Sequence, residues 1–280
     1  MLKEDRITEF LMEDIGQGDI TSAALIEEGQ KARARIYLKE EAVAAGLEEA
    51  GVLFSLLGCS VKTLVEEGVR VPADETLMEV EGPARAILSG ERTALNLLGR
   101  MSGIATAVSE AQRIVSKVNP AVRVAATRKT VPGLRELDKK AVKLGGGDTH
   151  RLRLDDCALI KDNHLELLSS IAEAVKRARE GVSFTKKIEV EVRSLEQAVE
   201  ASEAGADIVM FDNMQSEEIR DCLTALEGRG LRRGRLFEAS GGVTPENIAE
   251  YAGTGVDIIS MGCLTHSVRS LNVKLEIEMV

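Results

Sequence analysis

The residues best suited to chemistry in this chain are concentrated between Thr127 and His164. From Arg128 to His164 the sequence carries nine Lys or Arg and six Asp or Glu, a local charge of +3. The rest of the chain holds 27 basic and 40 acidic residues, a charge of −13. Two of the three histidines, His150 and His164, fall in the basic segment. A small basic region in an acidic chain indicates a site for a small anionic ligand, because a nucleic-acid surface needs a wider basic field.

Four basic side chains of this region have the chemistry to bind carboxylates or phosphates, Arg through a bidentate fork and Lys as a point charge. They are Arg128, Lys129, Arg151 and Lys161. Two acidic residues further along, Glu191 and Asp212, could accept hydrogen bonds from sugar hydroxyls or coordinate a hydrated Mg²⁺. The combination is much more specific than any one of these residues.

A glycine pair near the end of the chain could hold a phosphate group. Residues 240–247 read SGGVTPEN, and the pattern predicts a helix with Thr244 as its N-cap and Pro245 as its first residue. Backbone N–H groups at such a start would bind phosphate. By itself the motif is weak, since Gly-Gly turns often serve only as turns.

Composition limits the classes of function. The 280 residues are 44% hydrophobic, 29% charged and 2% aromatic, without Trp, and the net charge is −10. Acidic charge disfavours DNA and anionic membranes, and scarce aromatic residues disfavour base stacking. No apolar run approaches the roughly 20 residues that span a bilayer, and the N-terminus lacks a signal-peptide core. Four scattered cysteines without a CxxC pair predict reduced thiols and a cytoplasmic protein.

From Val122 onward short apolar runs alternate with amphipathic helical patterns. Strands are expected at 122–126, 158–161, 187–192, 207–211, 235–239 and 256–260. Helices are expected near 134–144, 167–180, 194–204, 216–227 and 245–252. Alternation of this kind predicts parallel strands with helical crossovers. Six strands are too few for a regular eight-stranded barrel, so an incomplete, open α/β barrel is expected, with a doubly wound sheet as the alternative.

Charged residues or glycines lie at the carboxyl end of every expected strand or directly after it. In chain order these are Arg128–Lys129, Lys161–His164, Glu191, Asp212–Asn213, Ser240–Gly242 and Met261–Gly262. Ligand chemistry in parallel α/β folds collects at the carboxyl ends of the strands, so these groups are expected to meet there. Glu189 and Glu191 alternate on one side of the apolar strand IEVEV, and a half-buried ion pair is the alternative interpretation of both.

The first part of the chain has a different pattern. A short helix is expected at 5–14, strands at 32–40 and 59–65, and helical spacing at 41–57 and 91–117. Gly99 and Gly103 interrupt the last pattern as breaks or as points of close packing. Residues 66–82 look like two short strands and resemble the hammerhead fold of biotinyl carriers, but no hairpin lysine is present, so the segment is interpreted as structural.

Several motifs together identify a known family. TRKTVPGLRELDKKAVKLGGGDTHR followed by LIKDNH resembles quinolinate phosphoribosyltransferases, as do GDIT at 18–21, ERTALNLLGRMSGIAT at 91–106, IEVEV, ASGGVTPENI and ISMGCLTHS. The resemblance covers nearly the whole chain in the same order. It implies an N-terminal α+β open-sandwich domain at 1–107 with the tail 268–280 packed on it. It also implies an incomplete α/β barrel at 108–267 and a homodimer, or higher oligomer, with shared active sites.

The resemblance also implies a reaction. Quinolinate and phosphoribosyl pyrophosphate would give nicotinate mononucleotide, pyrophosphate and CO₂ in de novo NAD biosynthesis, with Mg²⁺ and no organic cofactor. The implied catalytic residues are Lys129, Lys161, Glu191 and Asp212, and the last two would hold the metal, directly or through water. The implied substrate-binding residues are Arg92, Thr127, Arg128, Lys129, His150, Arg151, Lys161, Ser240, Gly241, Gly242, Ser260, Met261 and Gly262. Arg92 would come from the partner subunit.

Two alternatives stay open at this point. The related phosphoribosyltransferase of molybdenum-transport operons shares TRKT and GGG-x-x-HR, but the intact KDNH at 161–164 favours the quinolinate enzyme. A non-catalytic phosphate-binding barrel would keep Ser240–Gly242 and lose the basic and acidic set, which is complete here.

Overall fold

The structure is a computed structural model that describes residues 4–280. It divides into two compact units. The first contains the residues up to Ser109, Pro132–Gly146 and Ser267–Val280, and the second contains Glu110–Val131 and Gly147–His266. Residues 132–146, which the sequence analysis placed with the barrel, therefore group with the first unit. The domains expected from the sequence, 1–107 with 268–280 and 108–267, remain a prediction of which segments fold independently.

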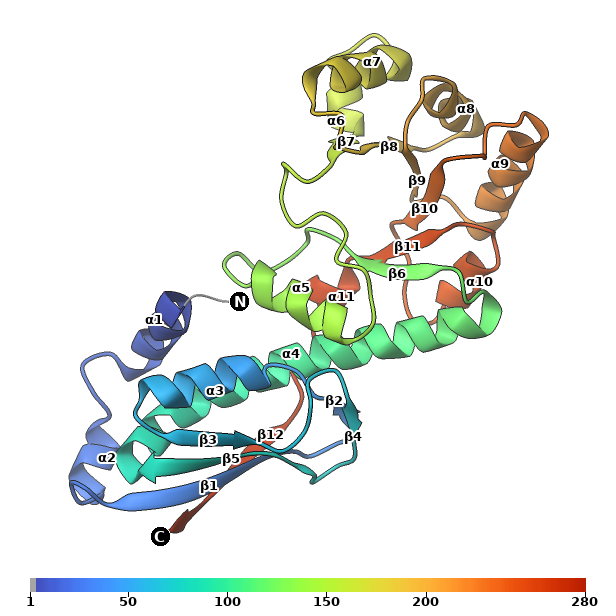
Figure 1. Cartoon of the computed structure of the whole chain (residues 1–280). Coiled ribbons are helices and arrows are strands. Elements are labelled where there is room, and N and C mark those ends of the chain that lie inside the picture. The colour runs from blue at the N-terminus through green and yellow to red at the C-terminus, as the bar shows by residue number, and fades with distance from the viewer. Residues whose placement is uncertain (1–3) are drawn as a thin grey trace. The chain divides into compact units, whose positions relative to one another are not determined.

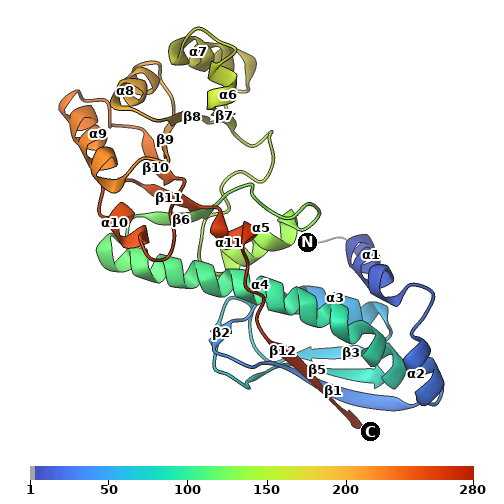
Figure 2. The same cartoon turned by 180° about the vertical axis from the view of Figure 1, so that it is seen from behind.

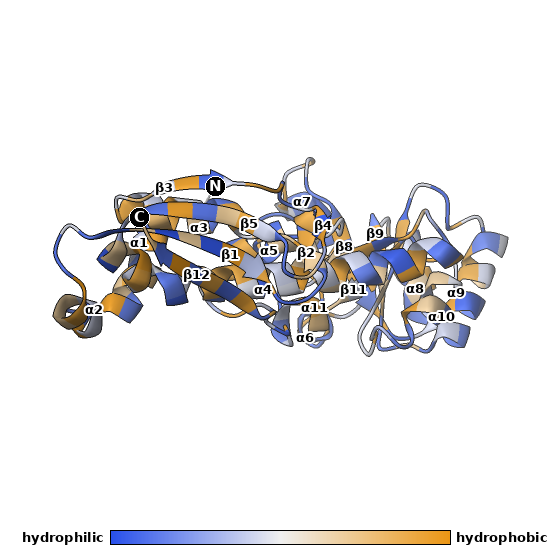
Figure 3. Ribbon diagram, turned by 90° about the horizontal axis from the view of Figure 1, so that it is seen from below, coloured by the Kyte–Doolittle hydropathy of each residue, from blue (hydrophilic) through white to orange (hydrophobic). Residues whose placement is uncertain are grey.

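The first unit is built on a four-stranded antiparallel sheet. Its order is β12-β1-β5-β3, with β12 at Val273–Met279, β1 at Lys31–Leu38, β5 at Thr76–Pro83 and β3 at Ser60–Thr63. Alternate residues of β1 are buried, and Figure 3 shows the corresponding change of hydropathy along β1 and β12. This alternation is that of a sheet with one face on a core and one face in solvent.

Five helices and a small two-stranded sheet complete the first unit. They are α1 (Glu4–Ile15), α2 (Ile20–Leu25), α3 (Leu47–Leu56), the first part of α4 (Ala84–Val118), α5 (Arg135–Leu144), and the pair β2 (Ala42–Val43) and β4 (Arg70–Val71). Helix α3 begins six residues later than the predicted 41. Gly46 has φ +91°, a left-handed conformation that cannot continue a helix, so the residues before it pair as β2 instead.

Helix α4 runs unbroken through its interior glycines, including Gly99 and Gly103, which the sequence offered as breaks or as points of close packing. A Cβ at Gly103 would lie 2.2 Å from the carbonyl oxygen of Arg269, and a Cβ at Gly99 would lie 2.8 Å from that of Leu271. The glycines therefore allow the C-terminal segment to cross the helix at close range, which confirms close packing and rules out a break.

The second unit contains the six-stranded parallel sheet that the sequence predicted. Its order is β6-β11-β10-β9-β8-β7, with β6 at Arg123–Ala126, β7 at Ala158–Ile160, β8 at Ile188–Val192, β9 at Ile208–Asp212, β10 at Leu236–Ser240 and β11 at Ile258–Met261. Each strand begins and ends within two residues of its predicted range. The first strand, β6, pairs with the last, β11, while β7 stays at the far edge. The sheet is therefore open between β6 and β7, as expected for an incomplete barrel.

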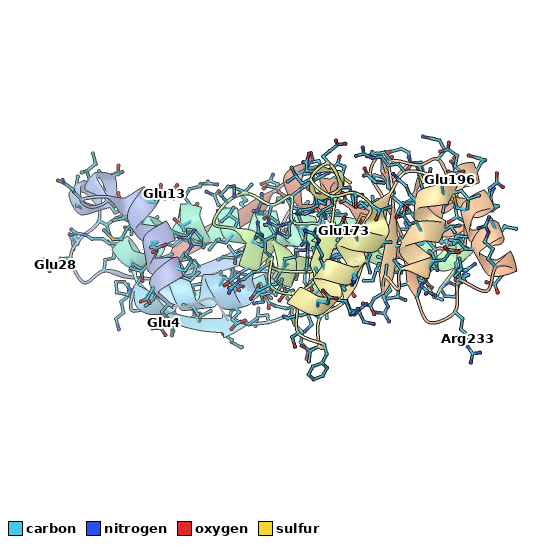
Figure 4. The ribbon with its side chains drawn as sticks, turned by 90° about the horizontal axis from the view of Figure 1, so that it is seen from above. Glu4, Glu13, Glu28, Glu173, Glu196 and Arg233 are labelled. Atoms are coloured by element: carbon cyan, nitrogen blue, oxygen red, sulfur yellow. The ribbon has the colours of Figure 1, made fainter. Side chains whose placement is uncertain are left out.

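Helices cover the outer side of this curved sheet, as Figures 1 and 2 show. They are α7 (Ile171–Gly181), α8 (Leu195–Glu203), α9 (Ser216–Gly228) and α10 (Ile248–Ala252), with two single turns at α6 (Asp162–Leu165) and α11 (Cys263–His266). Charged side chains lie on the outer side of this unit, where Figure 4 shows Glu196 of α8 and Arg233 of the turn after α9 pointing away from the ribbon. The strand interiors are aliphatic, with Phe211 and Phe237 stacked at 6.1 Å between ring centroids.

Two further sequence expectations can be compared with the structure. All four cysteines are free thiols, as predicted. Within residues 4–280 no helix has both the length and the apolar character that a membrane crossing requires.

Candidate active site

A cavity of about 500 Å³ lies at the carboxyl ends of the parallel strands of the second unit. Most of the predicted site residues line it: Thr127, Arg128, Lys129, His150, Arg151, Lys161, Glu191, Asp212, Ser240, Gly241, Gly242 and Ser260. All six strands contribute to its wall, either with their last residues or with the residues that follow them. The prediction that polar groups meet at one end of the sheet is therefore correct.

The open edge of β6 positions the basic loops. Asp148 forms two backbone hydrogen bonds with this edge, to Val124 and Ala126, at 2.8 and 3.0 Å. The chain then turns directly into His150 and Arg151, which face the cavity. In the loop that directly follows β6, the N–H of Lys129 donates to Thr127 Oγ1 at 3.1 Å. Both basic segments are thus fixed through the backbone at the gap in the barrel.

Each of the two carboxylates predicted to face the sugar and metal is paired with a cation in the structure. Lys161 forms an ion pair with Glu191 across the ends of β7 and β8. Asp212 accepts hydrogen bonds from Arg193, at 3.0 Å from Nε and 2.9 Å from Nη2. The site therefore holds alternating positive and negative groups, which suits a substrate pair with anionic ends and a sugar that becomes cationic in reaction.

The imidazole of His150 contacts two fully buried carboxylates, those of Glu189 and Glu238. Its Nε2 lies 3.2 Å from Glu238 Oε2 and 3.4 Å from Glu189 Oε2. Its Nδ1 accepts the N–H of Arg151 at 2.7 Å, and His150 itself has φ +49°, a conformation that is uncommon outside glycine. The three side chains fix this turn, and with it the backbone of Arg151.

Burial and hydrogen bonding have opposite effects on the pKa of His150 in this cluster. Burial alone would lower the pKa of His150, but hydrogen bonds to Glu189 and Glu238 outweigh it and raise that pKa to about 10. Burial raises the pKa of Glu189. The carboxylates favour a doubly protonated ring, whereas the N–H of Arg151 favours a ring protonated at Nε2 alone. In both states Nε2 donates to the glutamates.

The same cluster has the donor set of a divalent-metal site, since its three ligand atoms lie within 4.8 Å of one another. One oxygen of Glu189 and one of Glu238 are buried without a hydrogen-bond partner. The imidazole, however, already lies between the carboxylates. The arrangement therefore serves to orient His150, and the predicted metal residues, Glu191 and Asp212, lie elsewhere in the cavity.

The glycine pair follows β10 and lines the same cavity as the basic residues, in agreement with its predicted place at the end of a strand. Gly241 and Gly242 are both left-handed, with φ +83° and +66°, and Ser260 Oγ donates to Ser240 Oγ at 2.8 Å. The expected helix start at Pro245 is wrong, because α10 begins at Ile248 and residues 244–247 form a turn. In that turn the N–H of Thr244 donates to the side chain of Asn247, which replaces the predicted cap.

Gly241 gives the first testable prediction. A Cβ at this position would lie 2.4 Å from Asn213 Oδ1, so Gly241→Ala must displace Asn213 and strain the loop. We expect affinity for phosphoribosyl pyrophosphate, measured by calorimetry, to fall at least about tenfold. Gly230→Ala is the matched control, because Gly230 also has positive φ (+70°) but nothing within 4 Å of its Cβ. Equal affinity in both variants would show that this loop does not hold the phosphate.

Three predicted residues lie outside the walls of the cavity. Met261 is buried, and Gly262 lies beside Lys129, whose Cδ would be 3.0 Å from a Cβ there. Arg92 is an exposed residue of α4 in the first unit. Its predicted role depends on a second subunit.

Asp162, which the sequence placed among the groups at the end of a strand without giving it a role, also lines the cavity. Sequence reasoning missed two further lining residues, Arg193 and Glu238. Arg193 directly follows β8, so position alone could have identified it. Glu238 is a lone acid within the otherwise apolar strand LFEAS, and a fully buried charge in such a strand requires a partner. The acid in this strand predicts that Glu238 has a partner, but the sequence does not indicate that the partner is His150.

Comparison with known proteins decides the family. The model of the quinolinate phosphoribosyl transferase C-terminal domain matches residues 104–276, and the model of the N-terminal domain matches residues 19–102. The chain belongs to the quinolinate phosphoribosyl transferase family. Membership makes it a phosphoribosyl transferase, and the predicted family, fold class and enzyme class are confirmed.

Relatives of this phosphoribosyl transferase cover it almost completely. A protein of Methanothermobacter thermautotrophicus named probable nicotinate-nucleotide pyrophosphorylase (carboxylating) is 50% identical over 98% of both chains. The human nicotinate-nucleotide pyrophosphorylase (carboxylating) is 38% identical over 91% of this chain and 85% of its own. The crystal structure of NadC from Streptococcus pyogenes has a TM-score of 0.92 and 34% identity, covering 99% of this chain and 96% of the other.

Proposed function

We propose that this phosphoribosyl transferase joins quinolinate to the ribose of phosphoribosyl pyrophosphate and releases pyrophosphate and CO₂. The product is nicotinate mononucleotide, a step of de novo NAD biosynthesis. The observation that carries the proposal is the single cavity that combines Arg128, Arg151 and Lys161 with the carboxylates Glu191 and Asp212. Two anionic substrates need that many cations, and a sugar that develops positive charge needs the carboxylates.

In the proposed complex the basic residues bind the carboxylates of quinolinate. Arg128, Arg151 and Lys161 do so directly, next to the His150 turn, and Arg92 of a second subunit completes the set. Lys129 reaches the pyrophosphate group. The 5′-phosphate lies on the loop side of the cavity, where the groups proposed to hold it are Ser240, Gly241, Gly242, Ser260, Met261 and Gly262.

Glu191 and Asp212 face the ribose in this proposal. Departure of pyrophosphate leaves positive charge on the sugar, which these carboxylates stabilise electrostatically. The ring nitrogen of quinolinate then forms the new bond to the sugar and becomes cationic. That positive charge stabilises the electron pair left on the adjacent ring carbon when CO₂ departs. The carbon then takes up a proton from water, which completes nicotinate mononucleotide, so neither step requires an organic cofactor.

The donor set of the cavity fits the proposed Mg²⁺. Mg²⁺ prefers one or two carboxylates together with water and substrate phosphate oxygens, and Glu191 and Asp212 offer those carboxylates. When bound, it would offset charge on the pyrophosphate group. In the structure Lys161 pairs with Glu191 and Arg193 pairs with Asp212, which keeps both carboxylates neutralised and oriented.

A direct assay tests the proposal. The protein is incubated with Mg²⁺, phosphoribosyl pyrophosphate and quinolinate, and nicotinate mononucleotide, pyrophosphate and CO₂ are measured. We expect the three products in equal amounts. A parallel reaction with nicotinate in place of quinolinate is the control, since turnover of nicotinate with none of quinolinate would contradict the proposed substrate.

We further propose a cytoplasmic homodimer with shared active sites, and subunit mixing tests it. Arg92→Ala and Lys161→Ala subunits, each expected to retain only a few per cent of wild-type activity or less on its own (about 2 kcal/mol lost), are denatured and refolded together. In a mixed dimer the Arg92→Ala chain keeps Lys161 and receives Arg92 from its partner, while the other site carries both defects. About half the dimers are mixed with one good site each, so about a quarter of wild-type activity is expected. No recovery after confirmed reassembly would exclude a role for Arg92 across subunits.

A further inference from the structure

Arg193, which directly follows β8, joins the ends of three neighbouring strands through one guanidinium group. Its Nε and Nη2 donate to Asp212 Oδ2, at the end of β9, at 3.0 and 2.9 Å. Its Nη2 also donates to Asp162 Oδ2, two residues after the end of β7, at 2.9 Å. All three residues line the cavity.

The guanidinium of Arg193 occupies the oxygen of Asp212 that a metal ion would bind. Asp212 Oδ1 accepts the side-chain amide of Asn213 at 2.9 Å, and Oδ2 accepts both contacts from Arg193. Both oxygens of Asp212 are therefore engaged before any substrate is bound. A divalent cation that approaches Asp212 must displace the guanidinium or meet its positive charge at close range.

The exposures of the two groups show which one can move. The Arg193 side chain is 56% exposed, so the guanidinium can leave and be hydrated at little cost. The Asp212 side chain is only 16% exposed, and a partly dehydrated carboxylate without a cation is unfavourable. Asp212 therefore requires a positive partner at every stage, while Arg193 is free to exchange one anion for another.

We propose that Arg193 is an exchangeable counterion of the active site. It neutralises Asp212 and Asp162 while the cavity lacks phosphoribosyl pyrophosphate, and so keeps divalent cations out. When that substrate is bound together with its metal ion, Asp212 would hold the ion, and the Arg193 guanidinium would turn to the pyrophosphate oxygens, which a planar Arg fork binds well. The inference rests on the proposed function for the identity of the phosphate group, but its first half concerns the substrate-free protein alone.

Binding of Mn²⁺ to the substrate-free protein tests the exclusion. Free Mn²⁺ is counted by electron paramagnetic resonance, without quinolinate or phosphoribosyl pyrophosphate present. We expect Arg193→Ala to bind Mn²⁺ at least about tenfold more tightly than wild type, because the carboxylates lose their cation. Arg193→Lys, which keeps the charge, is expected to bind Mn²⁺ as weakly as wild type.

Two controls separate this effect from a general change of charge. Arg177→Ala removes an exposed arginine of α7 that pairs with Glu173, and it should leave Mn²⁺ binding unchanged. The double variant Arg193→Ala/Asp162→Asn should lose most of the gain of Arg193→Ala. Mn²⁺ binding by Arg193→Ala that is no tighter than wild type, or matched by Arg177→Ala, overturns the proposal.

The second half is tested by binding of pyrophosphate in the presence of Mn²⁺. We expect Arg193→Ala to weaken pyrophosphate binding about tenfold and to leave the Kd of quinolinate unchanged. Unchanged pyrophosphate binding would contradict the turn of the guanidinium. If the wild-type protein itself lacked transferase activity, the proposed function would fail. The Mn²⁺ measurements would still decide whether Arg193 excludes divalent cations.

Discussion

Replacing Lys161 with alanine is expected to lower kcat/KM for quinolinate by about 30-fold or more, equivalent to about 2 kcal/mol of transition-state stabilisation. Lys161 is the cation at the end of β7 and lies in the cavity wall beside Arg128 and Arg151. The variant loses a charge-assisted contact to a substrate carboxylate and also leaves Glu191 without its ion-pair partner. Both losses act on the reacting groups, so kcat should fall together with kcat/KM.

Lys176→Ala is the control for Lys161→Ala, because Lys176 is an exposed lysine of α7 outside the cavity wall. It removes the same charge from the same unit and should leave steady-state kinetics unchanged. Calorimetry with quinolinate alone separates binding from catalysis. A Lys161→Ala variant with wild-type kcat/KM would show that the substrate carboxylates lie at another part of the sheet.

Replacing Asp138 with alanine is expected to lower the free energy of unfolding of the first unit by about 3–5 kcal/mol. Asp138 is 0% exposed and accepts a bidentate pair from Arg100, with both contacts at 2.8 Å. Arg100 is only 18% exposed, so the alanine variant leaves a largely buried guanidinium without its carboxylate. Thermal unfolding, followed by circular dichroism, should show a lower Tm for the transition of this unit.

Two controls make the Asp138 prediction specific. Glu278→Ala breaks the exposed pair of Arg35 and Glu278, in which both side chains are more than half exposed, and should cost less than about 1 kcal/mol. The double variant Arg100→Met/Asp138→Leu removes both charges and should be more stable than Asp138→Ala alone. Equal losses for Asp138→Ala and Glu278→Ala would mean that the buried pair adds nothing beyond a surface contact.

The secondary structure of the barrel was predictable because its signals are local. The central parallel strands β8 and β9 are buried on both sides and appear as short apolar runs, and the helices between strands have an apolar stripe of period 3.6. Predictions were less accurate where the conformation of one or a few residues decides where a helix begins. Helix α3 begins later than predicted because Gly46 is left-handed, and α10 begins later because residues 244–247 form a turn.

The sequence alone therefore determined the family through its motifs and the open parallel barrel through its alternating strands and helices. It also determined most of the residues in the cavity wall, because these lie at the carboxyl ends of the strands. Only the tertiary structure decided the pairing of charges. Glu238 meets His150 across 88 positions, and Arg193 meets Asp212 across 19, because the sheet order brings β10 and β9 beside segments that are remote in the chain. A sequence shows that a buried acid needs a partner, but the partner is chosen by strand order and register, which local periodicity does not encode.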